Sequence, residues 1–85
     1  MAAGGFKEEY SKEMLERLGA RIRQLRKDRG YMNYEKISYD YNISRAQWGR
    51  YEKGQNITFL LILKIVKALE VTLEEFFRDF NTDSK

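Results

Sequence analysis

No proline interrupts the chain, which favours long helices because proline is the residue that most often ends or kinks them. From residue 7 to residue 29, apolar side chains recur mostly every four positions: Tyr10, Met14, Leu18, Ile22 and Leu25. This spacing places them on one face of a helix. Gly30 follows as a typical helix stop. The sequence therefore predicts a long first helix over residues 7–29.

A short second helix is predicted over residues 34–41. Asn33 precedes it as a capping residue, and Ile37 and Tyr41 lie one turn apart. Both side chains are expected to face inward. Asn42 follows, and asparagine tolerates the left-handed backbone conformation, so we expect a tight turn there.

Ser44 caps a predicted third helix that ends near Lys53, ahead of Gly54. Trp48 and Tyr51 lie three residues apart and are expected to face the core. The expected outward side carries Arg45, Gly49, Arg50 and Lys53.

Two more helices complete an all-α chain. The fourth is predicted from Thr58 to about Glu70, and the fifth is indicated by Thr72 and Glu75, which have the spacing of a capping box. The expected inner stripe of the fourth helix is Phe59, Ile62, Val66 and Leu69.

The 85 residues fit one domain with a modest core. We expect residues 11–80 to form this domain. Residues 1–10 are expected to be a flexible extension or the start of the first helix, and residues 81–85 a flexible tail. The longest apolar run, residues 59–63, is too short to span a membrane. No signal peptide is evident, so a cytoplasmic location is expected.

The chain contains no cysteine and no histidine. Thiol catalysis, imidazole acid–base chemistry and the usual zinc sites are therefore excluded. The carboxylates, lysines and hydroxyls show no catalytic spacing. We expect no enzyme activity, no metal, no cofactor and no small-molecule substrate.

The charge distribution is more informative than the net charge of +3. Residues 17–53 carry a net charge of +6, whereas residues 1–16 carry −2 and residues 68–85 carry −3. A basic middle segment suits a nucleic acid, because binding to phosphates releases counterions. On charge alone, a solvated charged surface is an equally good interpretation.

Four stretches, at residues 18–27, 42–45, 50–54 and 67–77, resemble successive blocks of the lambda-repressor-like helix-turn-helix family (Cro/repressor-type, XRE family). The resemblance covers residues 18–77. It implies a compact five-helix bundle, here with an extended first helix, whose third helix enters the major groove of double-stranded DNA. It also implies a bacterial or phage protein that associates with DNA.

The resemblance assigns roles to individual positions. Residues at positions that read base edges are Arg45, Ala46 and Arg50. Residues at positions that contact the DNA backbone are Ser44, Gln47, Lys53, Gln55 and Asn56. Tyr34 replaces a glutamine that contacts DNA in the family. Its hydroxyl can still reach a DNA phosphate, or its ring can pack against the protein without contacting DNA. Arg26 and Glu52 match a structural ion pair.

Gly49 needs a reason, because a glycine inside a helix costs roughly 0.5–1 kcal/mol relative to alanine. We expect it to form, with Ala46, a shallow floor that lets the helix approach base edges. The alternative is drift at an exposed position. Base stacking is a poor interpretation of the aromatic residues Tyr39, Tyr41, Trp48 and Tyr51, which we expect in the core.

These observations predict a sequence-specific DNA-binding transcriptional regulator without catalytic activity. The alternative is a protein-interaction or antitoxin-like module that uses the same fold, with DNA binding secondary. A homodimer is expected, because Leu60 and Leu61 fall outside the predicted inner stripe. Local packing under Phe76, Phe77 or Phe80 would explain these leucines nearly as well.

Overall fold

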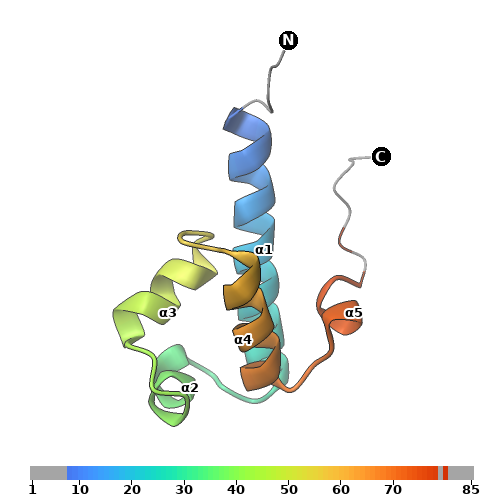
Figure 1. The fold of residues 1–85 in the computed structure, drawn as a ribbon. Helices are drawn as coiled ribbons and strands as arrows, with labels where there is room; N and C mark the ends of the chain where they lie inside the picture. The colour runs from blue at the N-terminus through green and yellow to red at the C-terminus, as the bar shows by residue number, and fades with distance from the viewer. Residues whose placement is uncertain (1–7, 79, 81–85) are drawn as a thin grey trace.

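The fold is built from helices. The computed structural model describes residues 8–78 and 80, and this part of the chain contains five helices and no strand. The helices are α1 (Glu8–Asp28), α2 (Tyr34–Asp40), α3 (Arg45–Glu52), α4 (Phe59–Leu69) and α5 (Leu73–Phe76). In Figure 1, α2 and α3 lie on one side of the long α1 and α5 lies on the other. The predicted all-α, five-helix architecture with an extended first helix is confirmed.

The expected terminal segments fall largely beyond what the structure describes. Residues 8–10 form the first turn of α1, so this part of the expected extension is helical. Residues 1–7 and the expected tail at 81–85 lie outside the described residues.

Side-chain caps start four of the helices. The side-chain oxygens of Asn33, Ser44, Thr58 and Thr72 each accept a hydrogen bond from a backbone N–H in the first turn of the helix that follows. These donors have no partner within the helix. All four predicted helix starts are therefore confirmed. The end of α1 is confirmed as well, because Gly30 follows it with a φ of +93°.

One core connects all five helices. It contains Ile22 and Leu25 of α1, Ile37 of α2, Trp48 and Tyr51 of α3, four residues of α4, and Phe76 of α5. The four residues of α4 are Ile62, Ile65, Val66 and Leu69. Trp48 is fully buried, and its ring lies at 61° to that of Tyr51 with 6.1 Å between the ring centroids. The expected inward direction of Trp48 and Tyr51 is confirmed.

Three expected core positions are wrong. Phe59 is 61% exposed because the buried side of α4 is centred on Ile62, Ile65 and Leu69, and Phe59, the first residue of the helix, lies at the margin of that side. Tyr41 is exposed because the backbone leaves the helical conformation there, and Ser38 is buried instead. Tyr39 is also exposed.

The inner face of α1 is shorter than its apolar spacing suggests. Its buried residues begin at Gly19, while Tyr10 is exposed and Met14 is half-buried. Figure 1 shows the N-terminal part of α1 extending beyond the other helices. Tyr10 and Met14 therefore line only a shallow apolar groove with Phe77 and Phe80.

Gly19 lies where α1 crosses the end of α3. A Cβ atom on Gly19 would come within 2.5 Å of the Glu52 carbonyl oxygen and 2.6 Å of the Gly54 backbone nitrogen. Gly54 in turn has a φ of +81°, and its own Cβ would overlap the Leu15 carbonyl. Both glycines are therefore required for α1 and the end of α3 to pack this closely.

Ser38 gives a prediction about stability. Its side chain is buried, and its hydroxyl has no hydrogen-bond partner among the described residues. We expect Ser38→Ala to raise the free energy of unfolding by about 1 kcal/mol, because it removes an unsatisfied polar group and alanine favours the helix. Chemical denaturation measures this change. A loss of stability would mean that the hydroxyl is satisfied in solution.

Candidate nucleic-acid interface

The helix-turn-helix consists of α2, the turn at residues 41–44 and α3. Asn42 adopts the left-handed conformation at φ +57°, as its sequence position predicted. The Ile43 N–H donates to the Ser38 carbonyl at 2.9 Å, and the Ser44 hydroxyl accepts from the Gln47 N–H at 3.0 Å. These bonds stabilise the turn, so the start of α3 has a fixed direction relative to α2.

The exposed side of α3 is polar and basic. Its exposed residues are Arg45, Ala46, Gln47 and Arg50, and Lys53 is exposed immediately after the helix. Trp48 and Tyr51 anchor the opposite side in the core. A helix that is buried on one side and exposes short and basic residues on the other can approach a polyanion without rearranging the core.

Gly49 is not part of this exposed side, so its expected outward position is wrong. It is buried, and a Cβ atom on it would lie 3.0 Å from the Tyr34 hydroxyl oxygen. The expectation failed because periodicity within α3 does not show where the first residue of α2 packs. The side chain that closely approaches Gly49 is that of Tyr34, and Ala46 alone supplies a short side chain on the exposed side.

Tyr34 is half-buried over Gly49. Its ring also lies against the Arg26 guanidinium, with 5.8 Å between the guanidinium carbon and the ring centroid. The ring therefore packs, as one of the two interpretations expected. Its hydroxyl makes no hydrogen bond to any residue that the structure describes.

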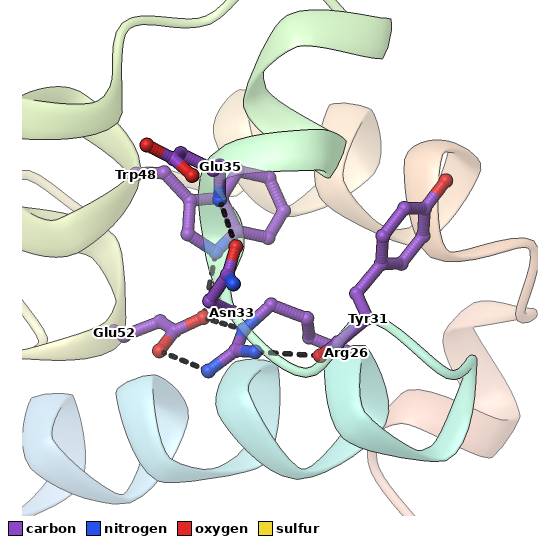
Figure 2. Close-up of polar contacts among 6 residues, drawn as sticks. All are labelled: Arg26, Tyr31, Asn33, Glu35, Trp48 and Glu52. Carbon is purple, nitrogen blue, oxygen red and sulfur yellow. Dashed lines mark hydrogen bonds and ion pairs between the residues drawn. The ribbon is translucent and has the colours of Figure 1, made fainter.

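A buried polar network connects α1 to α3 (Figure 2). Arg26 donates through Nε and Nη2 to the two carboxylate oxygens of Glu52, at 2.5 and 3.2 Å, and through Nη1 to the Tyr31 carbonyl at 2.7 Å. The Trp48 indole N–H donates to Glu52 at 2.6 Å. Both side chains of the ion pair are more than nine-tenths buried. The expected pairing of Arg26 with Glu52 is present, and Trp48 extends it.

An ion pair that the sequence did not predict joins the two motif helices. Arg45 Nη1 donates to Glu35 Oε2 at 2.6 Å, and both side chains are mostly exposed. No periodic signal connects positions 35 and 45, since they lie on different helices. Only the tight turn between α2 and α3 brings them together.

Much of the basic middle segment serves the fold. Arg21 donates to the carbonyls of Phe76 and Glu75 at 2.8 and 2.6 Å, which ties α5 to α1, and Arg29 donates to the Ala68 carbonyl at 3.3 Å. Four basic residues between positions 17 and 53 are exposed, and their side chains make no hydrogen bond or ion pair with the described residues: Arg23, Lys27, Arg50 and Lys53. The charge that is available to a polyanion is therefore concentrated at fewer positions than the sequence suggested.

The loop after α3 exposes Gln55 and Asn56. The Gln55 N–H donates to the Arg50 carbonyl at 2.8 Å, and Asn56 has a φ of +59°. These two residues therefore lie directly beyond Lys53 at the C-terminal end of α3.

The two leucines of the expected dimer contact differ. Leu60 is 61% exposed, whereas Leu61 is half-buried and packs against the core. The outward apolar side chains of α4 are Phe59, Leu60 and Leu63. The outward position expected of Leu61 is therefore wrong, and Phe59 and Leu63 take its place beside Leu60.

The groups with shifted pKa values form one cluster outside the α3 surface. A hydrogen bond from Lys36 lowers the pKa of Asp40, and the same bond raises the pKa of Lys36. Burial raises the pKa of Tyr31, and its hydrogen bond to Asp40 adds to this shift. None of these residues is a candidate DNA contact.

Two further findings concern the described part of the chain. It contains no group of three or more acidic, histidine or cysteine residues that could bind a metal ion. No helix within residues 8–78 is long and apolar enough to cross a membrane.

The comparison with family models gives one match. The model of the Cro/C1-type helix-turn-helix DNA-binding domain matches residues 21–81. Neither the search of curated proteins nor the search of solved structures gave a match.

Proposed function

Because this chain belongs to the family of Cro/C1-type helix-turn-helix DNA-binding domains, we propose that it is a sequence-specific transcriptional regulator that inserts α3 into the major groove. The observation that carries this proposal is the exposed side of α3, where Ala46 and Gln47 lie beside Arg45 and Arg50. An α-helix fits the major groove, and arginine is the side chain that pairs best with guanine there.

The residues around α3 divide by their chemistry. Arg45 and Arg50 would contact base edges, and Ala46 would allow α3 to approach them. Contacts to the phosphate backbone would come from the cap, the loop and the start of α2: Ser44, Gln47, Lys53, Gln55, Asn56 and Tyr34. We assign no base contact to Gly49, because Tyr34 covers it.

Binding-site selection from random duplex DNA tests this proposal. We expect enrichment of a defined site, with binding that weakens as salt increases because phosphate contacts release counterions. A failure to bind any duplex at about 50 mM salt, where such contacts are strong, would contradict the proposal. It would favour the alternative of a protein-interaction module.

Removing the side chains of Arg50 and Lys53 should affect DNA binding in different ways. We expect Arg50→Ala to cost about 1–3 kcal/mol on the selected site and to relax the preference at one or two base positions, with a smaller loss on random DNA. Lys53→Ala should weaken both kinds of binding alike and lower the salt slope by about one unit. Titrations of both variants on both DNAs measure this difference. Equal behaviour of the two variants would mean that Arg50 does not contact bases.

We also propose a homodimer formed through Phe59, Leu60 and Leu63 of α4. Three neighbouring apolar side chains on one exposed face form a surface that a two-fold axis could place against its own copy. Two α3 helices about 34–36 Å apart would then match successive major grooves.

Leu60→Lys tests the dimer, because a charge in a self-complementary apolar contact appears twice and repels its copy. We expect the wild-type chain to be dimeric in light scattering at high micromolar concentration and Leu60→Lys to be monomeric. Met32→Lys is the control, because Met32 is also exposed but lies outside α4. A wild-type monomer at that concentration would contradict this proposal.

A further inference from the structure

The ion pair between Glu35 and Arg45 occupies a position where a carboxylate would ordinarily oppose DNA binding. Glu35 lies in the first turn of α2, and Arg45 is the first residue of α3. Figure 2 shows the Glu35 side chain directed away from the Arg26–Glu52 network. It therefore takes no part in the buried contacts between α1 and α3.

Stability gives no sufficient reason for this pair. Both side chains are more than 60% exposed, and exposed ion pairs contribute little to folding. The packing of α2 on α3 is provided by buried side chains such as Ile37 and Trp48. We therefore look for the role of this pair at the exposed surface and not in the stability of the core.

The contact leaves part of the arginine available. Only Nη1 of Arg45 donates to Glu35, and Nε and Nη2 have no partner among the described residues. These two nitrogens are adjacent donors on one edge of the guanidinium group. Guanine presents two adjacent acceptors in the major groove, O6 and N7, so the free edge of Arg45 matches them while Nη1 donates to Glu35.

Glu35 also restricts what else Arg45 can do. An unrestrained arginine can turn toward any nearby phosphate, which adds affinity without adding preference for a sequence. Moving Arg45 away from Glu35 would leave a carboxylate beside the polyanion, and this juxtaposition is repulsive. The pair thus penalises the non-specific contact more than the contact with guanine.

We propose that Glu35 is a positioning residue that orients Arg45 toward a guanine and disfavours binding to DNA that lacks this base. The inference rests on the proposed function, since it requires α3 to face bases. It goes beyond it by assigning part of the sequence preference to a residue of α2 that is itself an acid.

Glu35→Gln tests the inference, with affinities measured on the selected site, on the same site with the Arg45-dependent guanine replaced, and on random duplex. That guanine is the position whose preference Arg45→Ala removes. We expect Glu35→Gln to bind random DNA several-fold more tightly while affinity for the selected site changes less. The ratio of the affinity for the selected site to the affinity for random DNA should fall by about tenfold. A change of this size is within the discrimination expected of one arginine–guanine contact.

Two controls separate positioning from a general charge effect. Glu13→Gln removes an exposed carboxylate that pairs with Arg17 on α1, and we expect it to leave the ratio unchanged. In an Arg45→Ala background, Glu35→Gln should change both affinities equally, because no arginine remains to be oriented. We expect Glu35→Gln to change the melting temperature only slightly, so unfolding of the variant would not account for the fall in the affinity ratio.

The outcomes distinguish the two proposals. If Glu35→Gln leaves the ratio unchanged, or lowers it equally in the Arg45→Ala background, the role of Glu35 is wrong even when Arg50→Ala still relaxes base preference. If Arg45→Ala and Arg50→Ala both leave base preference unchanged, or if the wild-type chain binds no duplex, the proposed function fails and the inference fails with it.

Discussion

Glu52→Ala should lower the free energy of unfolding by about 3–5 kcal/mol, the usual loss when one partner of a buried ion pair is removed. Arg26 would remain as a buried charge, and the Tyr31 carbonyl would be the only described group that still accepts a hydrogen bond from its side chain. The Trp48 indole N–H would also lose its acceptor. For a domain of this size each kcal/mol corresponds to a decrease of about 4–8 °C in melting temperature, so calorimetry should detect the change easily.

Two variants accompany this measurement. Glu13→Ala breaks the exposed pair with Arg17 on α1, and we expect a loss of no more than about 0.5 kcal/mol. Glu52→Gln keeps an oxygen that can accept from Trp48 but carries no charge, so its stability should lie between those of Glu52→Ala and the wild type. A Glu52→Ala protein as stable as Glu13→Ala would mean that the Arg26–Glu52 pair is open in solution.

Gly19→Ala should destabilise the protein by roughly 2–3 kcal/mol, the upper part of the usual range for overpacking. The added Cβ would meet the backbone at the end of α3, 2.5 Å from the Glu52 carbonyl oxygen, and backbone atoms cannot rotate away. In an open helix the same substitution stabilises by roughly 0.5–1 kcal/mol. The sign of the change is therefore diagnostic, and urea denaturation measures it.

Gly49→Ala is the matched control, because Gly49 is also a buried glycine inside a helix. Its Cβ would meet the Tyr34 hydroxyl at 3.0 Å, and that atom is the end of a side chain that can move. We expect a change smaller than about 1 kcal/mol. If Gly19→Ala proved as mild as Gly49→Ala, the close crossing of α1 and α3 would be wrong.

Local chemistry in the sequence determined where the helices begin and end. The capping side chains of Asn33, Ser44, Thr58 and Thr72, and the left-handed conformations of Gly30 and Asn42, depend on residues within a few positions of each other. Such short-range hydrogen bonds and backbone preferences form in the same way in any fold. The side of α3 that carries Trp48 and Tyr51 followed from helical periodicity for the same reason.

Periodicity could not show how far the core extends along each helix. Tyr10 and Phe59 continue the apolar stripes of α1 and α4, yet both are exposed. An apolar stripe identifies a face of a helix. The neighbours that are present determine which part of the face is buried.

The tertiary structure alone decided three of the contacts between helices. Gly19 meets the end of α3, Tyr34 covers Gly49, and Glu35 pairs with Arg45. Each contact joins residues from two helices whose relative placement depends on the packing of the whole core. Sequence spacing within a single helix contains no information about that placement, because side-chain direction repeats along the helix irrespective of what packs against it.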